Sequence, residues 1–152
     1  RAEVRQVAVL PDGQQVQVAE PGITRPLEPA EPAVVASWTA AGPTRPVPLG
    51  MVAGARSGDK GGDANVGVWV TDAAAWPWLA STLTEERLRE LLPEAVDLRV
   101  TRHVLPNLNA LNFVISGLLG QGVAAAARFD PQAKAVGEWL RSRHVDVPED
   151  LL

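Results

Sequence analysis

Residues 50–71 read GMVAGARSGDKGGDANVGVWVT, with apolar ends around a polar, glycine-rich centre. Six of the chain's 13 glycines lie in this stretch, and so does Lys60, one of only two lysines. Valine-rich runs favour strands, whereas closely spaced glycines allow the chain to reverse sharply. The pattern therefore predicts a strand over 49–55, a polar loop, and a second strand over 65–71.

The polar loop combines backbone and side-chain features that suit an anion. Uncovered N–H groups in a glycine-rich turn form a concavity of positive potential. Arg56 and Lys60 add two positive charges, and a guanidinium holds a carboxylate or phosphate through two parallel bonds. One interpretation is therefore that Arg56, Lys60 and the N–H groups of Ser57 to Gly62 bind an anionic metabolite.

The same stretch also allows a purely structural interpretation. Asp59 and Asp63 are able to bond their own backbone or to pair with Arg56 and Lys60, which would make the loop an internal lock. Neither standard phosphate-binding fingerprint is present, because the lysine precedes the paired glycines and the next segment is predicted as strand rather than helix. The residues alone leave both interpretations open.

Composition describes an ordinary globular chain with few reactive groups. Its 152 residues suffice for one domain with a core, and a net charge of −4 argues against nonspecific nucleic-acid binding. The lack of cysteine excludes a disulfide framework and a thiolate nucleophile. Without a long apolar run or a signal-peptide pattern, we expect a cytoplasmic protein with no membrane partner. The start at Arg1 suggests a fragment of a longer protein.

The chain divides by composition into three regions. Residues 1–20 predict a β-hairpin, because a Pro-Asp-Gly turn separates two valine-rich runs. Residues 21–48 contain seven prolines and predict an extended linker rather than a helix. Residues 49–152 form the main domain. Since an isolated hairpin is marginally stable, we expect it to need a partner in the main domain, a second copy or a missing neighbour domain.

Strand and helix patterns alternate through the rest of the main domain. They are a helix capped by Thr84 and ended by Pro93, a strand over 98–105, a helix capped by Asn107 or Asn109 that runs to Leu119, a strand over 123–129, a helix from Asp130 to about Arg143, and a tail over 145–152. The order ββαβαβα predicts an α+β fold with helices packed on one sheet.

Several motifs together resemble one known family. They are ARSGDKGGDANVG at 55–67, VLPNLNALNFV at 104–114 and FDPQAK at 129–134. Over about 49–143 the chain is similar to the C-terminal domain of the acyclic terpene utilisation (AtuA) family. The resemblance implies a ferredoxin-like two-layer sandwich, usually behind a larger N-terminal domain. It also implies bacterial catabolism of acyclic terpenes or related branched acyl compounds, with no established chemical step for this domain.

Two positions depart from the family pattern. Gln121 stands where a third glycine is expected between Gly120 and Gly122, and Ala133 stands where a glycine is expected before Lys134. These two departures argue against the prediction that the two turns form an intact binding surface. The R-S-G-D-K-G run itself is complete.

Polar residues outside the loop join the candidate binding site. Asn112 lies in an apolar segment, where a buried amide must find partners; it either ties that segment to the loop or faces a ligand. Lys134 either completes a cationic pocket with Arg56 and Lys60 or is simply exposed. The candidate ligand-binding residues are Arg56, Ser57, Gly58, Asp59, Lys60, Gly61, Gly62, Asn65, Asn112 and Lys134.

Catalytic chemistry finds little support in these residues. Ser57 and His103 lack the Gly-x-Ser-x-Gly elbow of a hydrolase, and no spacing typical of a metal site occurs.

We therefore expect an accessory binding domain without a resident cofactor, which holds a carboxylate, a phosphate or an acyl-CoA. One alternative is an oligomerisation domain in which the loop is a lock or clasp; the five tryptophans favour self-association into a homo-oligomer. A second alternative is a self-contained enzyme.

Overall fold

The computed structural model describes residues 5–20, 22–23, 25–28, 31, 34–35, 37–39 and 41–152. The chain falls into two compact units, 1–32 and 33–152, which are described separately. The start of the predicted hairpin and parts of the predicted linker over 21–48 lie outside the described residues.

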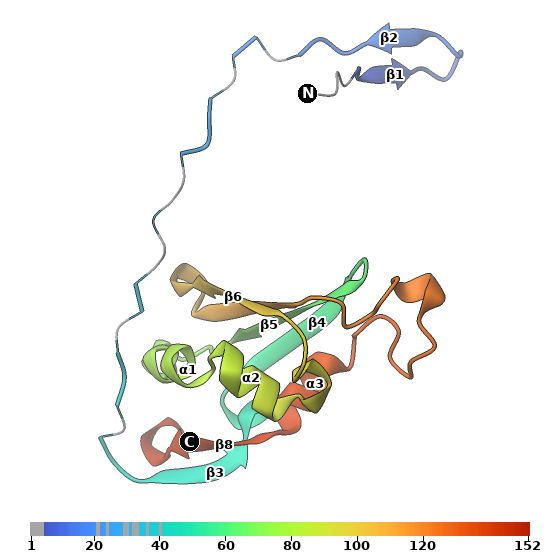
Figure 1. Ribbon diagram of the computed structural model, residues 1–152. Coiled ribbons are helices and arrows are strands. Elements are labelled where there is room, and N and C mark those ends of the chain that lie inside the picture. Colours follow the sequence, from blue (N-terminus) through green and yellow to red (C-terminus); the bar gives the residue numbers. More distant parts are fainter. Residues whose placement is uncertain are drawn as a thin grey trace. The chain divides into compact units, whose positions relative to one another are not determined.

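The first unit contains the predicted β-hairpin. β1 (Val7–Val9) pairs antiparallel with β2 (Gln15–Gln17), as Figure 1 shows. In the turn, the Asp12 carboxylate accepts the N–H of Gln14 at 2.9 Å, and Gly13 has a φ of 83°. Glycine adopts this φ without steric cost, so the Pro-Asp-Gly turn reverses the chain as the sequence predicts.

The second unit is built on a four-stranded antiparallel sheet in the order β4-β5-β7-β6. Helices lie on one face of this sheet, and a ribbon of β3 and β8 lies beyond them (Figure 1). Its strands are β3 (Thr44–Pro48), β4 (Gly54–Lys60), β5 (Asp63–Trp69), β6 (Val100–Leu105), β7 (Ala110–Ile115) and β8 (His144–Pro148).

The helices of this unit are short. The α-helices are α1 (Trp76–Thr82), α2 (Glu85–Leu91) and α3 (Val136–Ser142). The 3-10 helices are η1 (Leu49–Met51), η2 (Ala73–Ala75), η3 (Pro93–Ala95), η4 (Pro106–Leu108), η5 (Val123–Ala125) and η6 (Glu149–Leu151). Each helix of the described chain is too short or too polar to span a bilayer. The predicted α+β class, with helices packed on one sheet, is confirmed.

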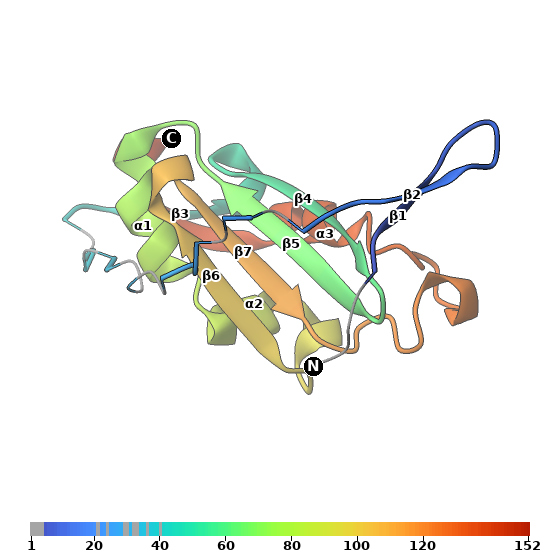
Figure 2. The same cartoon turned by 90° about the horizontal axis from the view of Figure 1, so that it is seen from above.

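Alternating side chains explain why the helices cover a single face. Val66, Val68 and Phe113 are fully buried, whereas Asn65 and Asn112 on the same strands are only partly buried. Burying one large apolar side chain contributes about 1.5–3 kcal/mol, so this face requires the helical cover that Figures 1 and 2 show.

The opposite side of the sheet, called the open face below, has no helix over it within the second unit (Figure 2). Strand pairing assigns to it Gly54, Arg56, Gly58, Lys60, Asp63, Asn65, Gly67, Trp69, Thr101, His103, Leu105, Ala110, Asn112 and Val114.

The two edges of the sheet are protected differently. Along β6 the N–H of Arg102 donates to the Glu85 carboxylate at 2.8 Å, and the Arg102 guanidinium donates to the carbonyl of Ala80. Burial lowers the pKa of Arg102, and the charge of Glu85 acts in the opposite direction. A charged side chain that occupies an edge in this way discourages pairing with another chain. The β4 edge lies against the segment that leads into α3, described below.

The polar centre of residues 50–71 is strand rather than loop. β4 continues through Lys60, and only Gly61 and Gly62 reverse the chain before β5. The first strand begins at Gly54, not at residue 49, because residues 49–51 form a 3-10 turn instead. Arginine, aspartate and lysine are acceptable in β4 because it is an edge strand with one side chain in two facing solvent.

The predicted helix from Asn107 to Leu119 is wrong, because this segment contains β7. Leu111 and Phe113 are fully buried and alternate with partly buried Asn112. A two-residue period fits a strand paired on both sides, which is the place that β7 occupies.

Three further expectations in the C-terminal region are also wrong. No strand forms over 123–129, all of which the structure describes. The last helix begins at Val136 rather than at Asp130, because Ala133 has a φ of 52°, outside the right-handed helical region. The tail contains β8. The order from β4 to α3 is therefore ββααββα rather than ββαβαβα.

The glycine turn between β4 and β5 is held against a second glycine-rich turn, residues 117–122. The N–H of Leu119 donates to the carbonyl of Gly62 at 2.9 Å. A Cβ on Gly62 would lie 2.2 Å from the carbonyl oxygen of Gly120, and one on Gly122 would lie 3.3 Å from that of Gly61. The two turns approach so closely that Gly62 admits no side chain.

We expect Gly62→Ala to destabilise the protein by about 2–3 kcal/mol, because its methyl group would collide with rigid backbone. Gly67→Ala is the matched control: its Cβ would meet nothing closer than 3.8 Å, so we expect a change within about 0.5 kcal/mol. Urea unfolding followed by circular dichroism measures both. Equal stability of the two variants would contradict the close contact of the turns.

Candidate functional site

Strand pairing divides the candidate residues between the two faces of the sheet. Arg56, Gly58 and Lys60 belong to the open face, whereas Ser57 and Asp59 between them point toward the helices. Gly58 pairs with Asn65, and Arg56 lies in one row with Gly67 of β5 and Asn112 of β7. The open face therefore gathers Arg56, Asn65 and Asn112.

The expected nest of free N–H groups from Ser57 to Gly62 does not form. Residues up to Lys60 lie in the antiparallel ladder with β5, where N–H groups alternate between the partner strand and the strand edge. Gly61 and Gly62 form the turn that packs against residues 117–122. Any anion bound here would therefore depend on side chains rather than on a loop of bare amides.

Ser57 is used to join β4 to the segment around α3. It is 7% exposed, its Oγ accepts the N–H of Gly137 at 2.8 Å, and it donates to the carbonyl of Lys134 at 3.2 Å. A Cβ on Gly137 would lie 3.3 Å from the Ser57 backbone nitrogen, so the helix approaches the strand closely. The Ser57 hydroxyl is thus committed to the fold.

Lys134 crosses the β4 edge from the helical side to the open face. Its carbonyl is bonded to Ser57, yet its Nζ lies 3.1 Å from the position of a Cβ on Gly58. The Asp130 carboxylate, 8% exposed, holds this segment by accepting the N–H groups of Lys134 and Ala135, each at 2.8 Å. A side chain at residue 58 would stand where the ammonium group lies.

Two asparagines on neighbouring central strands complete the polar part of the open face. Nδ2 of Asn65 donates to Oδ1 of Asn112 at 2.6 Å. Gly67 lies in the row between Arg56 and Asn112 and leaves the sheet backbone uncovered there. Asn112 thus ties its segment to Asn65 at the end of the glycine-rich stretch, although that segment is a strand rather than a helix.

The cations of this region are not neutralised by the nearby aspartates. Among the described residues, Arg56, Lys60 and Lys134 form no ion pair within 4.0 Å. Lys60 instead donates to the carbonyl of Asp59 at 3.1 Å, and Asp63 accepts the N–H of Gly117 at 2.8 Å. The expected lock of Arg56 and Lys60 with the aspartates is therefore absent.

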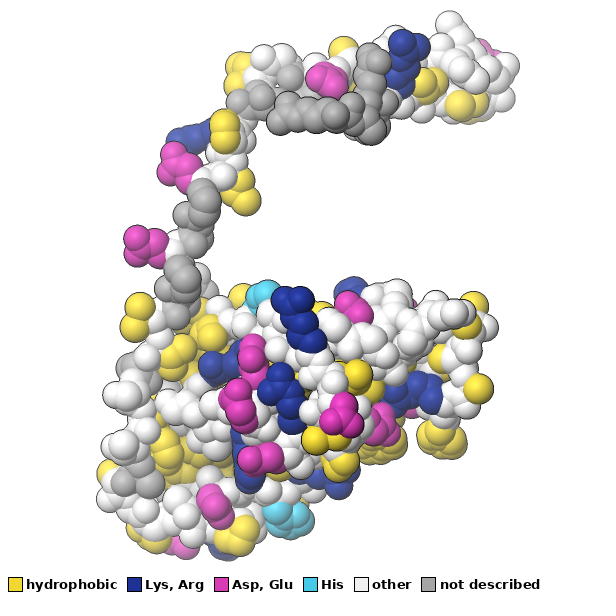
Figure 3. Space-filling view, in the orientation of Figure 1, with side chains coloured by type: hydrophobic (Ala, Val, Ile, Leu, Met, Phe, Trp, Pro, Cys, Tyr) yellow, Lys and Arg dark blue, Asp and Glu magenta, His cyan; other side chains and the backbone are white. Residues whose placement is uncertain are grey.

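Charges over the helices behave differently. Acidic and basic side chains lie intermixed on the side that Figure 3 shows. Arg87 pairs with Glu90 at 2.6 Å, and Arg141 pairs with Glu138 at 2.9 Å. The helical side thus compensates its own charges, whereas the open face carries an excess of positive charge.

The arrangement does not support hydrolytic chemistry. Ser57 faces the helices and His103 belongs to the open face, so the sheet separates a serine and a histidine that a triad would need in contact. Among the described residues, no three histidine, aspartate or glutamate side chains gather as a metal-ligand set.

Two residues of this region were not among the predicted ligand-binding residues. His103 lies in the same row as Asn112 and Gly67, and Asp130 positions Lys134 without reaching the open face itself. The alternation of Asn65 and Gly67 with buried valines is a signal that could have identified the open face. Asp130 carried a local signal, since Asp-Pro predicts a cap, but the position it gives Lys134 at the β4 edge depends on the path of the chain there.

Comparison with known proteins supports the predicted resemblance. A family model described as the AtuA ferredoxin-like domain matches residues 47–146. No curated protein and no solved structure matches the chain. The matched range contains the four-stranded sheet, α1, α2 and α3.

Removing the Ser57 hydroxyl tests its structural role. We expect Ser57→Ala to cost about 1–3 kcal/mol of unfolding free energy, because the buried N–H of Gly137 loses its acceptor. Ser142→Ala removes an exposed hydroxyl that donates to the carbonyl of Trp139, and we expect a change within about 0.5 kcal/mol. Thermal and urea unfolding of both variants provide the measurement. A neutral Ser57→Ala would show that this bond does not hold α3 to β4.

Proposed function

The chain belongs to the AtuA ferredoxin-like domain family, and we propose that it is an accessory domain that binds a small organic anion on its open face. The carboxylate or phosphate of this ligand lies between Arg56, Lys134 and Asn112. The domain positions the metabolite for a catabolic protein, expected in the cytoplasm, and supplies no reacting group of its own.

The position of the Lys134 ammonium group is the observation that carries this proposal. A lysine that served only solubility would extend away from the protein, but Nζ of Lys134 lies close above Gly58. Arg56 and Lys60 are the next residues of β4 on the same face, on either side of Gly58. Three cations in such proximity repel one another, and an anion among them would relieve that repulsion.

The neighbouring groups suit a carboxylate or a phosphate. Arg56 is exposed and presents its fork of donors to solvent. Oδ1 of Asn112 accepts the bond from Asn65, whereas Nδ2 of Asn112 donates no hydrogen bond within the described residues. Each charge-assisted hydrogen bond is worth about 1.5–3 kcal/mol when well ordered, and exposure on an open sheet reduces this value.

The other end of the open face is apolar. The Trp69 indole lies over Gly54, where a Cβ would approach it to 2.5 Å. Trp69 lies in one row with Ala110 and Leu105, and both Trp69 and Leu105 are more than one third exposed. A ligand that joins an anionic group to an apolar body, as an acyl-CoA does, would match this polarity.

A titration with anions tests the proposal. We expect inorganic phosphate, succinate or coenzyme A to bind with a saturable heat in calorimetry. Arg56→Gln and Lys134→Gln should each weaken binding about three- to tenfold, because each removes one charge-assisted contact. Gly58→Ala should also weaken it, because the added methyl displaces Nζ of Lys134 without touching the backbone.

Arg45→Gln is the matched control, since it removes one exposed arginine from β3 and leaves the open face unchanged. We expect its affinity to equal that of the wild-type protein. The proposal fails if none of the three anions gives a saturable signal. It fails equally if Arg45→Gln weakens binding as much as Arg56→Gln does, since net charge alone would then explain the effect.

A structural function is the second candidate, and the apolar end of the open face supports it. Leu108 in η4, three residues after Leu105, is 67% exposed. Exposed apolar residues gathered in this way are typical of contacts between proteins. In this case the open face joins two copies of the domain, and the glycine turns act only as an internal lock.

Light scattering distinguishes this second candidate. We expect a dimer at micromolar concentration in the wild-type protein and a monomer in Leu105→Lys, because a buried lysine would oppose the contact. Glu90→Lys introduces a lysine at an exposed position of α2, away from the open face, and should leave the mass unchanged. A wild-type monomer at millimolar concentration would rule out self-association through the open face.

A further inference from the structure

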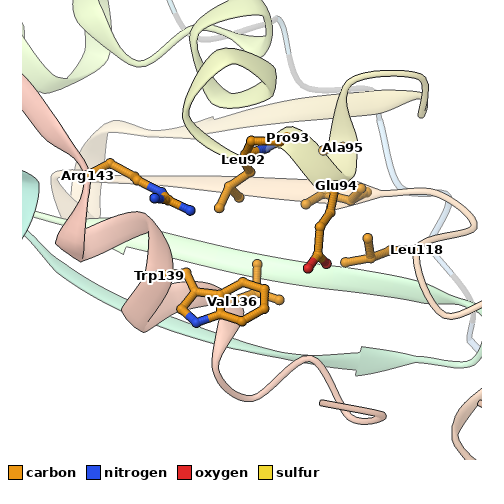
Figure 4. A pocket seen from close by; sticks show the side chains of 9 residues that line it. Leu92, Pro93, Glu94, Ala95, Leu118, Val136, Trp139 and Arg143 are labelled. Atoms are coloured by element: carbon orange, nitrogen blue, oxygen red, sulfur yellow. The ribbon is translucent and has the colours of Figure 1, made fainter. Parts of the chain in front are cut away.

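A second candidate ligand site lies on the helical side of the sheet, away from the open face. It is a pocket of about 260 Å³ between η3, α3 and the end of β7 (Figure 4). The residues that line it are Leu92, Pro93, Glu94, Ala95, Ile115, Leu118, Val136, Trp139 and Arg143. None of them belongs to the anion site proposed above.

The inner walls of this pocket are apolar and well supported. Leu92, Ala95, Ile115 and Val136 are each at most 4% exposed and belong to the main core. The Trp139 indole forms one side of the pocket, opposite Leu92 (Figure 4). An apolar pocket beside the core, with few charged groups at its rim, is a candidate site for ligand binding.

The two charged groups of the pocket differ in their partners. Glu94 is paired with Arg128, whose guanidinium also donates to the carbonyl of Leu118 at 3.1 Å. Arg143 forms no ion pair within 4.0 Å among the described residues. In Figure 4 the Arg143 guanidinium extends toward the pocket from the end of α3, on the side away from Glu94. The unneutralised charge at the mouth is therefore positive.

Pocket volume limits the size of the occupant. A cavity of about 150 Å³ holds one benzene molecule, so about 260 Å³ holds roughly ten non-hydrogen atoms by the same ratio. An aliphatic carboxylate of about eight carbons has this size. Its methylene chain would meet apolar walls, and its carboxylate would meet a guanidinium with matching fork geometry.

We infer that this pocket binds a medium-chain aliphatic monocarboxylate. The carboxylate lies at Arg143, and the chain runs past Trp139 toward Leu118. The ion pair of Glu94 with Arg128 lies at the far end, and because Arg128 is already neutralised there, that end offers no free positive charge to a second carboxylate.

Isoleucine methyl NMR provides a direct test, because the chain has two isoleucines. Ile115 lines the pocket, whereas Ile23 is 92% exposed in the other unit and serves as an internal reference. Titration of the whole chain with octanoate should shift the Ile115 δ1 methyl signal with a dissociation constant of about 0.1–1 mM. The Ile23 signal should not move.

Three variants separate the contributions. Arg143→Gln should weaken octanoate binding about tenfold and leave octan-1-ol binding unchanged, because only the acid uses the guanidinium. Leu118→Trp should abolish the Ile115 shift for both ligands by filling a half-buried wall of the pocket. Arg45→Gln should bind octanoate as the wild-type protein does.

Two results would overturn the inference. One is the absence of a saturable Ile115 shift with octanoate in the wild-type protein. The other is equal weakening of octanoate and octan-1-ol in Arg143→Gln, which would show that the arginine supports the fold of the pocket and does not recognise a carboxylate.

Discussion

The antiparallel pairing of β4 with β5 is the constraint on which the rest of the structure depends. Pairing imposes a two-residue period on a strand that is mostly polar, so its side chains separate strictly between two environments. Ser57 faces inward and bonds the helical layer, while Arg56 and Gly58 face outward. A single short strand thereby holds the sandwich together and presents a charged surface.

Glycine has two separate roles in this arrangement. At Gly62 and Gly122 the lack of side chains lets two turns touch through their backbones, which fixes the end of the β4–β5 hairpin. At Gly58 the lack of a side chain leaves room for a lysine that comes from a distant part of the chain. The same residue type thus supports rigid packing in one place and the proposed ligand contact in the other.

The segment around α3 connects the two sides of the sheet. Lys134, just before the helix, extends over the β4 edge, whereas Trp139 and Arg143 turn toward the pocket on the helical side. Asp130 and Ser57 hold this segment through partly or fully buried hydrogen bonds. Because both surfaces share one anchored helix, a loss of that anchoring would affect them together, although their ligands would differ.

The local sequence pattern predicted the α+β class, the Pro-Asp-Gly hairpin and the glycine-rich run that marks the family. It could do so because turns and amphipathic periods are encoded by neighbouring residues. It misassigned residues 107–119, since an apolar run is compatible with either a buried helix or a central strand until its partners are known. Only the tertiary structure decided that Ser57 faces the core, that Lys134 crosses to Gly58 and that Arg143 meets an apolar pocket. Those relations join residues far apart in the chain, and their geometry follows from strand register and helix packing, which no single segment specifies.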